Sequence, residues 1–139
     1  MKGLFVDTSG WMACADEADP FHTQARKIRD SWLKQGAFLV TTDYVMDETL
    51  TLLRVRLGLR ASEAWWRQVE GSPRVRWEPV DAARAEKARS LFFQLKDKKL
   101  SFTDCTSFAV MRELKLKHAL AFDAHFRQMG FHTTSAPQP

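Results

Sequence analysis

Four acidic residues stand at positions where a carboxylate is unusual: Asp7, Glu48, Asp104 and Asp123. Asp7 and Asp123 each end a short apolar run that is typical of a buried strand. Asp104 opens a predicted helix and lies on its buried side, because apolar residues follow it at helical spacing. A buried carboxylate costs free energy unless a neighbouring group compensates its charge. The chemistry of the chain therefore depends on what balances these four charges.

Helix capping is an ordinary explanation for three of these acids. Asp7 and Asp123 each precede a predicted short helix, where an aspartate can accept hydrogen bonds from the first backbone N–H groups. Ser101 and Asp104 have the spacing of a capping box, and the helix dipole favours an acid in the first turn. Taken one at a time, these aspartates can therefore be structural.

Glu48 falls within the apolar face of a helix predicted over about residues 43–57. Helical spacing assigns that face to Val45, Leu52, Val55 and Leu59. A glutamate in such a face can form a buried salt bridge or lie at the edge of the face. It can also reach into a site, and the pattern leaves these alternatives open.

A parallel sheet would bring the four acids together. If the strands predicted at residues 4–6 and 119–122 are neighbours, their carboxyl ends place Asp7 and Asp123 close together, and helices can direct the other two acids to the same pocket. Carboxylates that share a pocket repel one another and acquire raised pKa values. A divalent cation resolves this repulsion, and an all-oxygen ligand set favours Mg²⁺ or Mn²⁺ over zinc. Such a site can hydrolyse phosphodiester bonds.

The order of predicted elements supports this arrangement. Strands are expected at 4–6, 38–40, 75–80, 119–122 and 131–133, with the third at or near a sheet edge because of Pro79. Helical segments lie between them. This alternation predicts an α/β sandwich with a mostly parallel sheet of four or five strands. We expect one domain over residues 1–133 and a flexible tail over 134–139.

Composition excludes several classes of protein. The chain has 139 residues, of which 45% are hydrophobic, and a net charge of +4, which favours polyanions such as RNA. Cys14 and Cys105 form no CxxC pair, so neither a zinc knuckle nor a disulfide framework is expected. No apolar run reaches the ~20 residues of a membrane span, and Asp7 comes too early for a signal peptide. We therefore expect a cytoplasmic protein with no membrane association.

Other polar residues are secondary candidates. Several basic side chains could contact RNA phosphates: first Arg54, Lys96, Lys98 and Lys99, and also Arg56, Arg60 and Lys115. Asp97 is expected to be a surface residue. The four histidines lack metal-ligand spacing, and for His125, although it is close to Asp123, we expect a surface or helix-end role. Ser9 lacks the G-x-S-x-G context of a serine hydrolase.

Four segments of the chain resemble, in order, the acidic motifs of the PIN domain, and most closely those of VapC-type ribonuclease toxins. They are Val6-Asp7-Thr8-Ser9, Asp47-Glu48, Leu100-Ser101-Phe102-Thr103-Asp104-Cys105 and Ala121-Phe122-Asp123-Ala124-His125-Phe126. The first and third motifs are the most specific. The resemblance runs from Asp7 to about Phe131, nearly the whole chain.

The resemblance implies a three-layer α/β/α sandwich with strand order 3-2-1-4-5. It implies that Asp7, Glu48 and Asp104 are the main metal-binding acids and that Asp123 completes the site. Ser9, or Thr8, would orient Asp7.

The implied function is a Mg²⁺- or Mn²⁺-dependent endoribonuclease acting on single-stranded RNA. As a toxin it would form a homodimer and bind a cognate antitoxin, and the helix that carries Trp65 and Trp66 is where we expect protein contact. Two alternatives remain. One is a PIN-fold nuclease of RNA processing without an antitoxin, and the other is a non-catalytic RNA- or protein-binding module.

Overall fold

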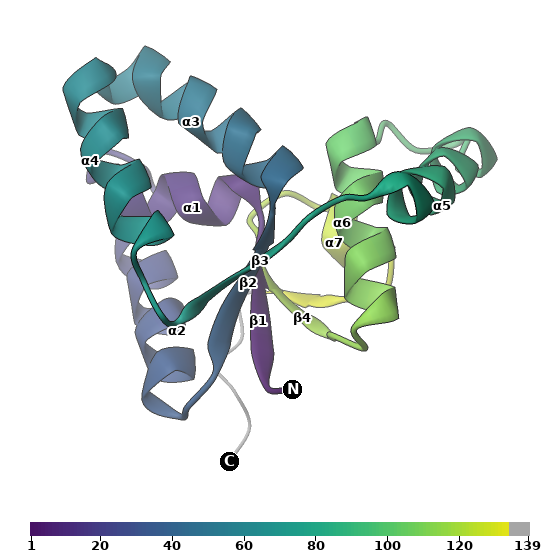
Figure 1. The fold of residues 1–139 in the computed structure, drawn as a ribbon, viewed down its shortest axis with the longest axis horizontal. Coiled ribbons are helices and arrows are strands. Elements are labelled where there is room, and N and C mark those ends of the chain that lie inside the picture. Colours follow the sequence, from purple (N-terminus) through teal and green to yellow (C-terminus); the bar gives the residue numbers. More distant parts are fainter. Residues whose placement is uncertain (134–139) are drawn as a thin grey trace.

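A five-stranded parallel sheet forms the centre of the molecule in the computed structural model, which describes residues 1–133 (Figure 1). The predicted tail, 134–139, lies outside the described residues. The strand order β3-β2-β1-β4-β5 confirms the predicted order, and every neighbouring pair runs parallel. The strands are β1 (Gly3–Val6), β2 (Phe38–Thr42), β3 (Val75–Glu78), β4 (His118–Leu120) and β5 (His132–Thr133).

Helices cover both faces of the sheet. Figure 1 shows α1, α2 and α4 on one side and α5, α6 and α7 on the other, with α3 leading from the end of β2 towards α4. No helix of the described chain is long and apolar enough to span a membrane. The helices are α1 (Thr8–Ala15), α2 (His22–Lys34), α3 (Asp43–Leu57), α4 (Leu59–Glu70), α5 (Ala82–Gln94), α6 (Phe102–Glu113) and α7 (His125–Gln128).

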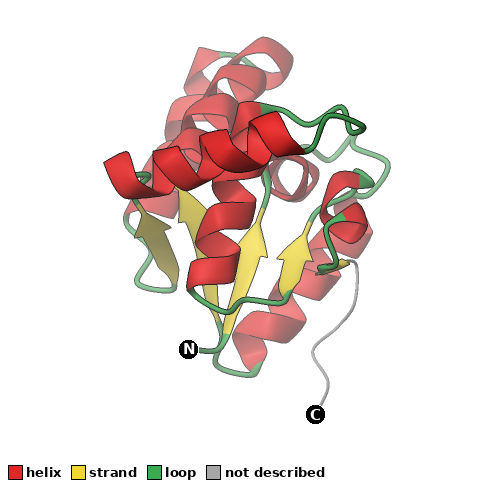
Figure 2. Ribbon diagram, turned by 90° about the vertical axis from the view of Figure 1, so that its right-hand side faces the viewer, coloured by secondary structure: helices red, strands yellow, loops and turns green. Residues whose placement is uncertain are grey.

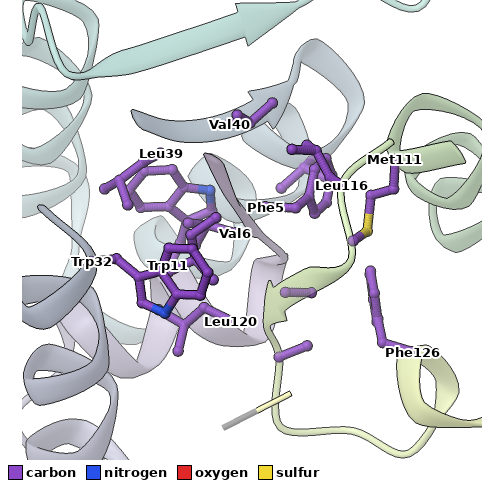
Figure 3. Close-up of a cluster of buried hydrophobic side chains, with 14 of the residues drawn as sticks. Phe5, Val6, Trp11, Trp32, Leu39, Val40, Met111, Leu116, Leu120 and Phe126 are labelled. Carbon is purple, nitrogen blue, oxygen red and sulfur yellow. The ribbon is translucent and has the colours of Figure 1, made fainter. Parts of the chain in front are cut away.

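The central strand β1 is buried on both faces, as expected for a parallel sheet covered by helices. Alternate side chains of β1 enter the two layers of the core (Figure 3). Val6 points towards Trp11 and Leu120, whereas Phe5 points towards the side of Met111 and Phe126. The strands point the same way in Figure 2, so the residues that follow β1 and β4 emerge at one edge of the sheet.

A close approach of α1 to β4 fixes the geometry at this edge. A Cβ atom on Gly10 would lie 2.2 Å from the backbone oxygen of Leu120, so only glycine fits there. The backbone N–H of Asp7 donates to the same oxygen at 3.1 Å. Glycine at position 10 therefore lets the first acidic residue lie beside the end of β4, a requirement that the sequence pattern did not indicate.

The predicted apolar face of the helix over 43–57 is wrong beyond its first turn. Of the residues assigned to it only Val45 is buried, and the exposed ones are Leu52, Val55 and Leu59. The face that packs inward consists of Val45, Met46, Thr49 and Leu53. The Thr49 hydroxyl donates to the carbonyl of Val45 at 2.7 Å, and this bond allows a polar residue to be buried. Glu48 is consequently exposed, and within residues 1–133 it forms no buried salt bridge.

Candidate active site

A pocket at the carboxyl edge of the sheet is lined by all four acids that the sequence singled out, together with Thr8 and Ser9. Asp7 follows β1, Asp123 lies just beyond β4, Asp104 is in the first turn of α6, and Glu48 is on α3. Because β1 and β4 are neighbours, with Val6 paired to Leu120, the expected proximity of the two strand ends is present. Residues separated by more than 100 positions in the sequence thus share one pocket.

Ser9 links the two strand ends. Its hydroxyl donates to Asp7 Oδ2 at 3.1 Å and accepts from the backbone N–H of Phe122 at 3.0 Å. Asp7 occupies the N-cap position of α1, but its side chain makes no capping hydrogen bond there. Capping therefore does not explain this aspartate.

The ionised form of Asp7 would carry a charge that the described residues do not balance. Its side chain is buried, and burial followed by the negative charges of Asp123 and Asp104 raises its pKa to about 8. Hydrogen bonds from Ser9 and the Thr8 backbone oppose this rise without cancelling it. A cation in the pocket would stabilise the ionised form of Asp7.

Asp104 takes part in the cap of helix α6 and also lines the acidic pocket. The predicted capping box is present: the Asp104 backbone N–H donates to Ser101 Oγ at 3.0 Å, and the Ser101 N–H donates to Asp104 Oδ2 at 3.3 Å. Burial is the largest cause of a raised pKa at Asp104, and the charge of Asp123 adds to it. Among residues 1–133 no hydrogen bond occupies the other carboxylate oxygen, Oδ1. Capping and ligand binding are thus compatible at this residue.

His125 lies in the site, which sequence reasoning missed. Its Nδ1 is 3.0 Å from Asp104 Oδ2 and 3.8 Å from Asp123 Oδ1, and it donates to Asp104 when that nitrogen is protonated. The histidine also begins α7, so a helix-end position and a pocket position coincide. Its spacing of two residues from Asp123 was the available signal, since the turn between them returns the ring to the acids.

Glu48 faces the same pocket from its rim. The residue is exposed, and in the described part of the chain it takes part in no salt bridge. A long, exposed glutamate can change rotamer to reach a cation without unfolding its helix.

The donor set fits a divalent cation of the Mg²⁺ class. As they stand, no three His, Cys, Asp or Glu side chains within residues 1–133 converge closely enough to enclose an ion. Mg²⁺ needs less than that, because it usually binds through one or two carboxylates and keeps several waters. The buried Thr8 hydroxyl lines the pocket and has no hydrogen-bond partner among the described residues, so it can bond to a polar group brought into the site.

The predicted basic contacts divide into three groups, of which the first, Arg56, lines the acidic pocket itself. Lys98 and Lys99 line a shallow hollow that also includes His125 and therefore adjoins the acidic pocket. Arg54 and Lys96 are exposed and line neither hollow. Asp97 pairs with Lys98 at 3.2 Å, and this contact lowers the pKa of Asp97.

Comparison with known proteins relates this geometry to a family. Residues 4–132 match the family model of the PIN domain. The 23S rRNA-specific endonuclease VapC20 of Mycobacterium tuberculosis is 38% identical over 128 residues, covering 92% of this chain and 95% of that protein. The ribonuclease VapC26 of the same organism is 27% identical over 126 residues, covering 88% and 89%.

Solved structures agree with the fold. The crystal structure of M. tuberculosis VapC20, described as a sarcin–ricin loop cleaving toxin, has a TM-score of 0.84 at 36% identity and covers 93% of this chain and 96% of that one. FitAcB from Neisseria gonorrhoeae has a TM-score of 0.66 at 17% identity, with coverage of 94% and 95%. The second similarity shows the shared fold alone.

Proposed function

Because the chain belongs to the PIN domain family, we propose that it is a Mg²⁺- or Mn²⁺-dependent endoribonuclease that hydrolyses phosphodiester bonds of single-stranded RNA. The observation that carries the proposal is the convergence of Asp7, Glu48, Asp104 and Asp123 on one pocket at the carboxyl edge of the sheet. The names of the relatives, an endonuclease and a ribonuclease, support the same reaction class.

Each residue of the site has a distinct role in this proposal. Asp7, Asp104 and Glu48 would hold the cation, and Asp123 would complete the set. When bound, the cation would act as a Lewis acid and would lower the pKa of a bound water molecule, the nucleophile for phosphodiester hydrolysis. Ser9 orients Asp7 through its 3.1 Å hydrogen bond. Ser101 and His125 both bond to Oδ2 of Asp104. These two bonds fix the orientation of the carboxylate and leave Oδ1 without a hydrogen bond from the described residues.

Ribosomal RNA is the substrate that we propose to test first. The relative that shares 38% of its residues with this chain is named for 23S rRNA, and its crystal structure is described as that of a sarcin–ricin loop cleaving toxin. A loop of RNA presents unpaired bases and a backbone that can bend into a pocket. The basic hollow formed with Lys98 and Lys99 would contact flanking phosphates.

We also propose that the protein is a toxin, homodimeric, and controlled by a cognate antitoxin. Large apolar side chains stay exposed along α3 and the start of α4, including Val55 at 79% and Leu59 at 59%. Trp65, on the helix where protein contact was predicted, lines a groove together with Trp11 and Leu57. Apolar surface of this kind favours a protein partner.

Co-expression tests the antitoxin proposal. The product of the neighbouring gene should co-purify with the protein and relieve growth arrest caused by it. If expression is harmless and no small partner protein is encoded beside the gene, a nuclease of RNA processing is the better description. Light scattering of the purified protein tests the homodimer.

Cleavage of a mixed RNA pool that includes ribosomal RNA tests the nuclease. We expect cleavage with Mg²⁺ or Mn²⁺, none with EDTA, and none by Asp7→Asn or Asp104→Asn. Glu86→Gln removes an exposed carboxylate that lines neither the acidic pocket nor the basic hollow, so it should cleave normally and serves as the matched control. RNA binding that ignores both the cation and Asp104→Asn, without cleavage, would instead indicate a non-catalytic binding module.

A further inference from the structure

An aromatic pair borders the acidic pocket. Phe21 stacks on Phe122 with ring centroids 4.6 Å apart and an interplanar angle of 8°, and both rings line the pocket. Phe21 nevertheless remains 43% exposed, which is unusual for a phenylalanine with a stacking partner available. A ring with this exposure, supported from behind by a second ring, is suited to bind a flat apolar ligand.

The pair is attached rigidly to the acids. Phe122 directly precedes Asp123, and its backbone N–H is held by Ser9, the residue that also bonds to Asp7. On the other side, Asp19 Oδ1 accepts the backbone N–H of Phe21 at 2.9 Å. Pro20 between them restricts the backbone further. Little ordering is therefore left to occur when a ligand stacks on Phe21.

A cation lies beside the aromatic pair. Arg56 lines the same pocket, and its Nη1 is 3.8 Å from Asp19 Oδ2, while its side chain stays 49% exposed. Among the described residues that line this pocket, it is the one with a permanent positive charge. The contact is long and the guanidinium is half exposed, whereas the Asp19 carboxylate is 13% exposed and also accepts the backbone N–H of Phe21. Asp19 therefore keeps a hydrogen bond when the guanidinium turns to a phosphate, and the exchange costs little.

We propose that Phe21, Phe122 and Arg56 form a nucleotide-binding subsite, in which one unpaired RNA base stacks on Phe21 and an adjacent phosphate pairs with Arg56. The proposal rests on the proposed function, because it places this nucleotide beside the bond to be cleaved. Stacking is tolerant of base identity, so the subsite contributes affinity and positioning. Arg56 also offsets the repulsion between phosphate and the acids of the pocket.

Binding experiments with two matched probes test the subsite. One probe is a fluorescein-labelled oligoadenylate, and the other is the same ribose-phosphate chain without bases. Both are titrated by anisotropy against protein carrying Asp104→Asn to prevent cleavage. Adding Phe21→Ala should weaken oligoadenylate binding about tenfold and leave binding of the abasic chain unchanged. Phe21→Trp should retain the affinity for oligoadenylate, which a general folding defect would not allow.

Arg56 and a distant aromatic residue complete the comparison. Arg56→Gln should weaken binding of both probes and reduce the salt dependence by about one phosphate contact. Phe93→Ala removes an aromatic ring that is 67% exposed and lines none of the described hollows, so it should change neither affinity.

Two outcomes would overturn the subsite, and they are distinguishable. If the wild-type protein cleaves RNA with metal while Phe21→Ala binds oligoadenylate as tightly as the parent, the subsite is wrong and the nuclease stands. If the wild-type protein neither cleaves RNA nor binds either probe, the proposed function and the subsite are both wrong.

Discussion

Asp104 illustrates how one residue can serve the fold and the site together. Its backbone and Oδ2 form the capping box of α6, and the same Oδ2 meets His125. The sequence presented these uses as alternatives, because spacing reveals the cap but not what approaches from a distant loop. The acids could be found from their positions after apolar runs or within helical patterns, and for His125 the spacing from Asp123 was a weak signal. The place of Phe21 could not be found, since only the folded loop brings it to the pocket, and Arg56 could be named as a basic residue but not placed beside the acids.

Replacing Asp7 should stabilise the metal-free protein while abolishing its activity. The folded-state pKa of about 8 lies above the ordinary value of 3.8, so between these pH values the folded protein holds a proton that the unfolded chain has lost. Stability of the metal-free protein therefore falls as the pH rises through this range. Asp7→Asn removes the penalty, and its Tm should exceed that of the wild type by about 3 °C or more above pH 8.

The pH dependence provides the control for this prediction. The Tm values of wild type and Asp7→Asn should converge below about pH 3, where the aspartate is protonated in the folded protein and largely protonated in the unfolded chain. A lower Tm for Asp7→Asn at high pH would show that the ionised carboxylate is already compensated in the metal-free protein.

His125→Ala should reduce cleavage about 10- to 100-fold, because the residue positions the Asp104 carboxylate. The apparent affinity for Mn²⁺ should fall with it, while circular dichroism stays unchanged. His125→Asn, whose amide can still donate a hydrogen bond, should recover part of the activity. His132→Ala removes an exposed histidine outside the pocket and is the matched control. Equal activity of both alanine variants would contradict a positioning role.

The elements were more predictable than the faces they present. Hydrophobic runs located the strands, since buried parallel strands are continuously apolar, and their alternation with helices predicted a parallel sheet. The strand order came from the resemblance to the PIN domain. The inward face of α3 was not predictable from apolar spacing. Thr49 is polar yet buried, because its hydroxyl donates a hydrogen bond to the Val45 carbonyl, whereas the apolar Leu52 and Val55 are exposed. The close packing of α1 on β4 could not be predicted from the sequence either, because a glycine in a helix has several possible explanations.

Gly10→Ala should destabilise the protein by about 3 kcal/mol or more, even though alanine is the better helix former. The added methyl group would lie 2.2 Å from the Leu120 oxygen and would force α1 away from β4. Urea denaturation measures the change. Ala15→Gly, in the same helix and half-buried, should cost only about 1 kcal/mol. A stabilised Gly10→Ala protein would mean that α1 can shift without cost.

At the scale of the whole molecule, the net charge and the charge of the pocket have opposite signs. The net charge of +4 favours an RNA partner, yet the pocket itself is lined by five acids against a single arginine. Phosphate cannot approach such a pocket favourably unless added positive charge offsets the acids. The fold brings these groups together because two neighbouring parallel strands end at the same edge. The net charge is compatible with an RNA partner, but composition alone does not indicate this arrangement.

Calorimetric titration of the metal-free protein with Mn²⁺ tests the central claim most directly. We predict saturable binding to the wild type and to Asp97→Asn, and loss of that binding in both Asp7→Asn and Asp104→Asn, because these two carboxylates line the pocket and Asp97 does not. Undiminished Mn²⁺ binding by Asp7→Asn and Asp104→Asn, or no binding by the folded wild type, would contradict the account of this pocket as a cation site.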